Sequence, residues 1–173
     1  MGQVIAFPVP PTPYPDLAAE LDTAECVLLS AIRCWVESYR DGDDPIPRLR
    51  HGLETAGSPD AAYPIDRLMT VLARAVTRPV DIHCPQCPRL SLDEKNLLRA
   101  ASLAQDDDSH LAEKVLRTTL LSAQGAEFAI GALESLGKLF AQARLFLSRR
   151  RAPAEDAGTA DGREAWSPPR TLN

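Results

Sequence analysis

The residues with the clearest capacity for chemistry lie in the short stretch His83-Cys84-Pro85-Gln86-Cys87. Two cysteines separated by two residues can direct both thiolates at one tetrahedral Zn²⁺, and the neighbouring imidazole offers a nitrogen. A structural zinc site needs a fourth ligand, and the other two histidines of the chain are distant in sequence. Cys84, Cys87 and His83 are the predicted metal ligands, with zinc as the candidate ion.

The same stretch also admits redox chemistry. Its Cys-Pro-x-Cys spacing resembles the active site of glutaredoxin-like proteins, where the first thiol lies at a helix N-terminus. Here Pro88 directly follows Cys87, and the βαβ pattern of that fold is absent. A thiol switch, or a reversible disulfide between Cys84 and Cys87, does not need that fold. The remaining interpretation is a loop at a helix junction whose thiols are incidental.

The other two cysteines, Cys26 and Cys34, lie eight positions apart in a helical segment. Eight residues correspond to about 12 Å of helical rise, so these thiols can neither bridge each other nor share a metal ion. They lie off the main apolar stripe of their helix. Packing, or a second contact face, is the predicted role.

Other polar clusters have structural explanations. The acidic run Asp106-Asp107-Asp108 lacks the glycine and distal glutamate of an EF-hand loop and is predicted to cap a helix. The chain contains no Gly-x-Ser-x-Gly, P-loop, Rossmann or His-Glu-x-x-His motif. An enzyme is therefore disfavoured, and one built from distant helices would need a deep polar pocket.

These residues must be positioned by helices. Apolar residues recur at helical spacing in several segments, and Ser91-Leu92-Asp93-Glu94 is a capping box that predicts a helix start at Ser91. Low aromatic content with abundant Ala and Leu also favours helix-on-helix packing. The predicted fold is all-α, a single compact array of five or six helices. Its helices are expected at residues 16–40, 47–56, from 61 or 64 to 77, 91–105, 109–123, and from after residue 125 to an end near 148–151.

The two ends are predicted to lie outside this array. Residues 1–15 hold five prolines, which predicts a disordered Pro-rich arm. Residues 151–173 are rich in Pro, Gly and charge and are predicted to form a disordered tail. The predicted helical domain therefore spans residues 16–150.

Charge and hydropathy bear on partners and location. A net charge of −5 and a pI near 5.2 make nucleic acid an unlikely partner. The chain shows no apolar run long enough to span a bilayer and no signal peptide, so a cytoplasmic location is expected. Four cysteines in a reducing compartment favour thiols over a disulfide framework.

The stretch from Arg78-Pro79 through Cys84-Pro85-Gln86-Cys87-Pro88 to Leu90-Ser91-Leu92-Asp93-Glu94 resembles small uncharacterised helical proteins of alphaproteobacteria. The resemblance covers about residues 16–148. It implies a bacterial helical protein with a Pro- and Cys-containing loop before an Asp-Glu helix start. The resemblance implies no particular activity.

Together these observations predict a non-enzymatic bacterial regulatory or accessory protein that acts through protein contacts. Its partner would be another protein or a second copy of the chain. A contiguous exposed apolar patch would favour this hypothesis. The alternative is a metal- or redox-responsive protein that uses the His83-Cys84-x-x-Cys87 loop.

Overall fold

The computed structural model describes residues 11–152, which fold into six α-helices and two short 3-10 helices. The all-α prediction of five or six helices is confirmed. The 3-10 helices are η1 (Ala18–Glu20) and η2 (Pro59–Ala61). The α-helices are α1 (Thr23–Asp41), α2 (Pro45–Glu54), α3 (Ala62–Ala75), α4 (Leu92–Gln105), α5 (Ser109–Thr119) and α6 (Ala123–Gln142).

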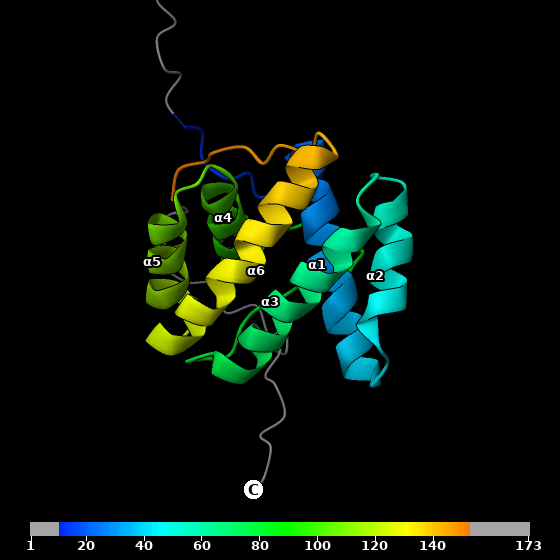
Figure 1. Ribbon diagram of the computed structural model, residues 1–173, viewed down its shortest axis with the longest axis horizontal. Helices are drawn as coiled ribbons and strands as arrows, with labels where there is room; N and C mark the ends of the chain where they lie inside the picture. The colour runs from blue at the N-terminus through cyan, green and yellow to red at the C-terminus, as the bar shows by residue number, and fades with distance from the viewer. Residues whose placement is uncertain (1–10, 153–173) are drawn as a thin grey trace, which may run out of the picture.

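The longest helix, α6, crosses the middle of the molecule and packs against α3, α4 and α5 (Figure 1). On the other side, α1 packs against α2, α3 and α4, which leaves α2 at one edge of the array and α5 at the opposite edge. Within residues 11–152, no helix combines the length and apolar character that crossing a bilayer requires.

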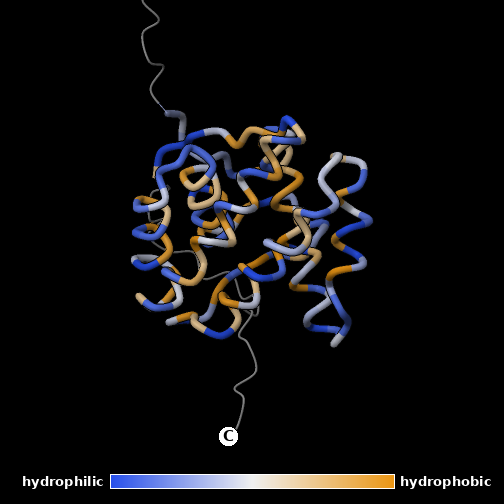
Figure 2. The backbone as a smooth tube through the Cα atoms, viewed as in Figure 1, coloured by the Kyte–Doolittle hydropathy of each residue, from blue (hydrophilic) through white to orange (hydrophobic). Residues whose placement is uncertain are grey.

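The core is a single cluster to which every α-helix contributes apolar side chains, and apolar positions recur along the helices (Figure 2). Trp35 and Phe140 are the largest fully buried side chains. Because a buried indole N–H needs an acceptor, Trp35 Nε1 donates to Asp66 Oδ1 (2.7 Å). This hydrogen bond ties α1 to α3.

Local sequence signals set several helix boundaries. Ser91 accepts a hydrogen bond from the Glu94 backbone N–H at the start of α4, which confirms the predicted capping box. Pro45 stands in the first turn of α2, where its missing N–H has no cost. Gly57, at φ +73°, lies in the left-handed region just after α2, as a helix terminator should.

Several predicted helix ends are wrong: the helix expected at 109–123 ends at Thr119, and the last helix already begins at Ala123. Tertiary contacts explain the two largest errors. The first helix begins at Thr23 instead of residue 16, because Leu17 forms an antiparallel bridge with Arg89. The last helix ends at Gln142, and Arg144 then turns the chain at φ +59°. The side-chain amide of Gln105 donates to the Leu145 carbonyl (2.9 Å) and holds this turn.

Some contacts of the described residues lie outside the predicted helical domain of 16–150. Tyr14, which falls in the predicted arm, is buried in the core. The backbone N–H of Arg151 donates to the Thr12 carbonyl (2.9 Å). The remainder of the predicted arm and tail, residues 1–10 and 153–173, lies outside the described residues.

Candidate functional site

The predicted site residues lie in the connection between α3 and α4, and we call residues 80–91 of this connection the thiol loop. Its shape depends on Glu94, whose side chain is fully buried in the first turn of α4. Glu94 Oε2 accepts from the Ser91 backbone N–H (2.9 Å), and Oε1 accepts from the His83 backbone N–H (3.1 Å). The Glu94 carboxylate therefore holds the main chain of the thiol loop at two places, His83 and Ser91.

The charge of Glu94 is balanced by Arg33 of α1, which is also buried at 3% exposure. Arg33 Nε donates to Glu94 Oε1 (2.7 Å) and Nη2 donates to Oε2 (3.0 Å). The same guanidinium donates to the carbonyls of Cys87 (2.6 Å) and Arg89 (2.7 Å). A bidentate ion pair in the interior therefore holds the main chain of the thiol loop against α1.

A second charged pair braces the start of the loop. Arg78 donates to both carboxylate oxygens of Asp93, with one distance of 2.9 Å. Asp93 Oδ2 also accepts from the Asp81 backbone N–H (2.8 Å). The Ser91 hydroxyl donates to the Asp81 carbonyl. The Ser-x-Asp-Glu sequence therefore anchors the loop as well as starting α4.

The two loop cysteines occupy the ends of a tight turn. The Cys87 backbone N–H donates to the Cys84 carbonyl (3.0 Å), with Pro85 and Gln86 as the central residues. Proline suits the second position of such a turn because its φ is already set. Cys84 is exposed and Cys87 is half-buried. Both line one surface groove of about 360 Å³, together with His83 and Arg40.

His83 is the third predicted ligand, and both of its ring nitrogens face oxygen atoms. Nδ1 donates to the Arg89 carbonyl (2.9 Å), and Nε2 lies 3.5 Å from Asp81 Oδ2. Across residues 11–152, no group of three or more His, Cys, Asp or Glu side chains is placed to hold a metal ion. Zinc binding by Cys84, Cys87 and His83 stays a prediction.

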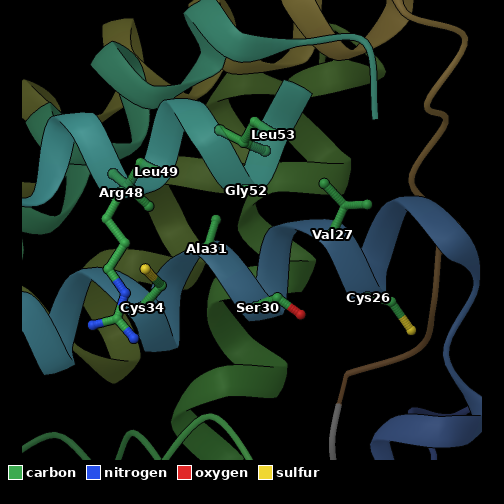
Figure 3. Close-up of a pocket in the computed structure, with 9 residues that line it drawn as sticks. All are labelled: Cys26, Val27, Ser30, Ala31, Cys34, Arg48, Leu49, Gly52 and Leu53. Carbon is green, nitrogen blue, oxygen red and sulfur yellow. The ribbon is translucent and has the colours of Figure 1, made fainter. Parts of the chain in front are cut away.

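The other cysteines line a different feature, a groove of about 310 Å³ between α1 and α2. The lining residues follow helical spacing on both elements (Figure 3). We call it the α1–α2 groove, lined by Cys26, Val27, Ser30, Ala31, Cys34, Arg48, Leu49, Gly52 and Leu53.

Apart from Arg48, the lining of this groove carries no charged residue. Arg48 reaches from α2 toward Cys34 (Figure 3) and pairs with Glu37. Burial raises the pKa of the Cys34 thiol, with Arg48 opposing the shift, and burial also raises the pKa of Cys26, reinforced by Glu25. Both thiols therefore remain protonated at neutral pH and behave as small apolar groups.

The acidic run Asp106-Asp107-Asp108 and the basic run Arg149-Arg150-Arg151 after α6 have structural roles. Arg149 pairs with Asp108 (2.7 Å) just before α5, and Arg150 donates to both carboxylate oxygens of the buried Glu25 (2.7 Å each). The acidic run and the basic run therefore help to fix the segment after α6.

Comparison with known proteins gave no match: no family model, curated protein or solved structure is similar to this chain.

Several residues of these sites were missed in the sequence, among them Arg33, Arg40, Arg48 and Gly52. Arg33 offered a usable signal, because it stands four residues after Leu29 and three before Val36, on an apolar helix face. A charged residue at such a position requires a buried partner. The sequence did not identify that partner.

Proposed function

We propose that the protein is a non-enzymatic regulatory or accessory protein of the bacterial cytoplasm that binds an amphipathic helix of a partner protein in the α1–α2 groove. The observation that supports this proposal is the groove itself, a mostly apolar hollow on the surface at the edge of the array. The four cysteines, all present as thiols, suit a reducing compartment.

The shape of the groove favours a helix as its occupant. Cys26, Ser30 and Cys34 follow one another at intervals of four along α1, which makes the groove about 12 Å long. That length equals a little over two helical turns. A partner helix with apolar side chains at positions i, i+4 and i+7 would place all three of these side chains along the α1–α2 groove.

The chemistry of the lining favours apolar anchors. Val27 supplies partly exposed aliphatic surface beside the buried Ala31 and Leu53, and the protonated Cys26 and Cys34 thiols add no charge. At about 310 Å³ the groove is at the small end of ligand sites, so it fits a row of anchor side chains.

Gly52 provides the test, because a Cβ added there would meet no atom within 4 Å. Gly52→Leu should fill the groove without disturbing the packing of α2, and Gly52→Ala is the matched control. The probe is a panel of synthetic amphipathic helical peptides with leucine at i, i+4 and i+7, alongside permuted peptides without an apolar face. Binding is measured by fluorescence anisotropy, and NMR shift changes locate it.

We expect the amphipathic peptides to shift signals of Val27, Ala31 and Leu53. Gly52→Leu should weaken binding by at least about tenfold, and Gly52→Ala should leave it nearly unchanged. Equal binding of the permuted peptides, or no binding by any peptide, would contradict the proposal. A wild-type dimer that becomes monomeric with Gly52→Leu in sedimentation would instead assign the groove to a second copy.

A further inference from the structure

The thiol loop carries an inference that does not depend on the α1–α2 groove. We propose that Cys84 and Cys87 form a reversible dithiol–disulfide pair that exchanges with small, carboxylate-bearing disulfides of the glutathione class. The argument rests on the turn between the two cysteines, on the anchoring of its main chain and on the groove that both side chains line.

The turn brings the two cysteines within bonding range. A hydrogen bond from the Cys87 N–H to the Cys84 carbonyl closes it (3.0 Å). The first and last Cα atoms of such a turn lie within about 7 Å. Disulfides join Cα atoms about 4.4–6.8 Å apart, so the backbone is already within or near the range of a disulfide.

The main chain around the turn is held independently of the thiols. Arg33 binds the Cys87 and Arg89 carbonyls, and Glu94 binds the His83 N–H, all through the buried ion pair of α1 and α4. Closing a disulfide therefore requires rotation of two side chains and no rearrangement of helices. Because these hydrogen bonds involve main-chain atoms and not the thiols, the dithiol and disulfide forms can both keep them.

The groove beside the turn offers one exposed cation to a small anionic disulfide. It has a volume of about 360 Å³ and is lined by both cysteines, by the exposed Arg40 of α1 and by Asp81, whose carboxylate lies 3.5 Å from His83 Nε2. Arg40 also lines a smaller hollow with Cys84, Glu37 and Asp41. A guanidinium at this place can attract the carboxylate of an incoming disulfide and leave its sulfur near Cys84.

The exchange proceeds in two balanced steps. The exposed Cys84 thiolate attacks one sulfur of the small disulfide, forms a mixed disulfide and expels the first thiolate. The Cys87 thiolate then attacks the Cys84 sulfur, forms the intramolecular disulfide and expels the second thiolate. The protein loses two protons and two electrons, and the small disulfide becomes two thiols.

The experiment uses the full chain carrying Cys26→Ser and Cys34→Ser, so that only the loop thiols remain. Protein is equilibrated in glutathione buffers of graded ratio, alkylated and analysed by mass spectrometry. We expect one two-electron transition to a Cys84–Cys87 disulfide. Adding Cys87→Ser should stop the reaction at a glutathione adduct on Cys84, while Cys84→Ser should form an adduct more slowly.

Arg40→Ala tests the recognition step. It should slow the reaction with glutathione disulfide severalfold and leave the reaction with the uncharged hydroxyethyl disulfide unchanged. Equal rates for wild type and variant would overturn the assignment of the ligand class. Absence of an intramolecular disulfide at every ratio would overturn the dithiol pair, as would one tightly bound zinc per chain that protects both thiols from alkylation.

Discussion

Replacing Arg33 with methionine should be among the most damaging single changes to this fold. Methionine keeps the unbranched stem but removes the guanidinium. Glu94 would then be a fully buried carboxylate without its guanidinium partner, with only the His83 ring nearby at 3.7 Å. The Cys87 and Arg89 carbonyls would lose the Arg33 donor, and the Arg89 carbonyl would keep only the His83 ring N–H. Removing one partner of a buried ion pair costs about 3–5 kcal/mol.

The matched control is Arg48→Met, which makes the same substitution in an exposed pair with Glu37. Exposed pairs contribute about 0–1 kcal/mol. For a protein of this size, 1 kcal/mol shifts Tm by about 2–4 °C. Arg33→Met should therefore lower Tm by about 6–20 °C and Arg48→Met by less than about 4 °C, measured by circular dichroism and checked by urea unfolding.

The double variant Arg33→Met/Glu94→Met completes a thermodynamic cycle. It removes the stranded charge, although the Ser91 and His83 N–H groups lose their acceptor. Its cost should therefore be smaller than the sum of the two single costs by about 2 kcal/mol or more. Two results would refute the conclusion that Arg33 and Glu94 form a coupled buried ion pair. One is a loss of unfolding free energy in the double variant equal to the sum of the two single losses. The other is a loss for Arg33→Met no larger than that for Arg48→Met.

Further predictions concern packing, pH and the groove. Gly137→Ala should destabilise the protein by about 1–2 kcal/mol, because the new Cβ would lie 2.9 Å from the Gln105 Cα. Gly131→Ala on the same helix has open space and should stabilise the protein by about 1 kcal/mol. The urea unfolding midpoint should therefore fall for Gly137→Ala and rise for Gly131→Ala. Burial, reinforced by Glu25, raises the pKa of Tyr14, so the unfolded chain releases this proton first and the free energy of unfolding should fall above about pH 10. In urea unfolding experiments between pH 8 and 11, the free energy of unfolding of Tyr14→Phe should fall less steeply with pH than that of wild type. Equal pH dependence of the two proteins would contradict this prediction. Gly52→Ala should raise stability by up to about 1 kcal/mol, and a lower Tm would show that its position is not open.

The fold class and several boundaries could be predicted because the signals are local. A capping serine with a glutamate three residues later marks the start of α4 wherever it occurs, and Gly57 ends its helical segment through its own backbone freedom. The apolar spacing within each helix was likewise visible. These properties depend on residues within one or two turns of each other.

The errors arise where distant contacts decide. Leu17 fits the apolar stripe of α1, yet its backbone pairs with Arg89, so the helix starts later. Leu147 continues the pattern of α6, yet the Gln105 side chain binds the Leu145 carbonyl and the Leu147 N–H. No local pattern records either contact.

The candidate site likewise depends partly on local sequence signals and partly on contacts between distant residues. The cysteine spacing and the turn prolines identified the thiol loop. The anchor that shapes it, Arg33 with Glu94, joins residues 61 positions apart. The α1–α2 groove was not predicted: the sequence assigned Cys26 and Cys34 only to packing or a second contact face, because the other wall of the groove comes from α2.

The contact between Thr12 and Arg151 has a practical consequence. The Arg151 N–H reaches the Thr12 carbonyl across 2.9 Å, and the Arg150–Glu25 ion pair holds the same corner. A linker of a few residues could join these two points covalently, and the chain could be opened instead at the exposed Thr55 between α2 and η2. Such a circular permutant would keep every helix in place while moving the α1–α2 unit to the end of the chain, with η2 and α3 at its beginning.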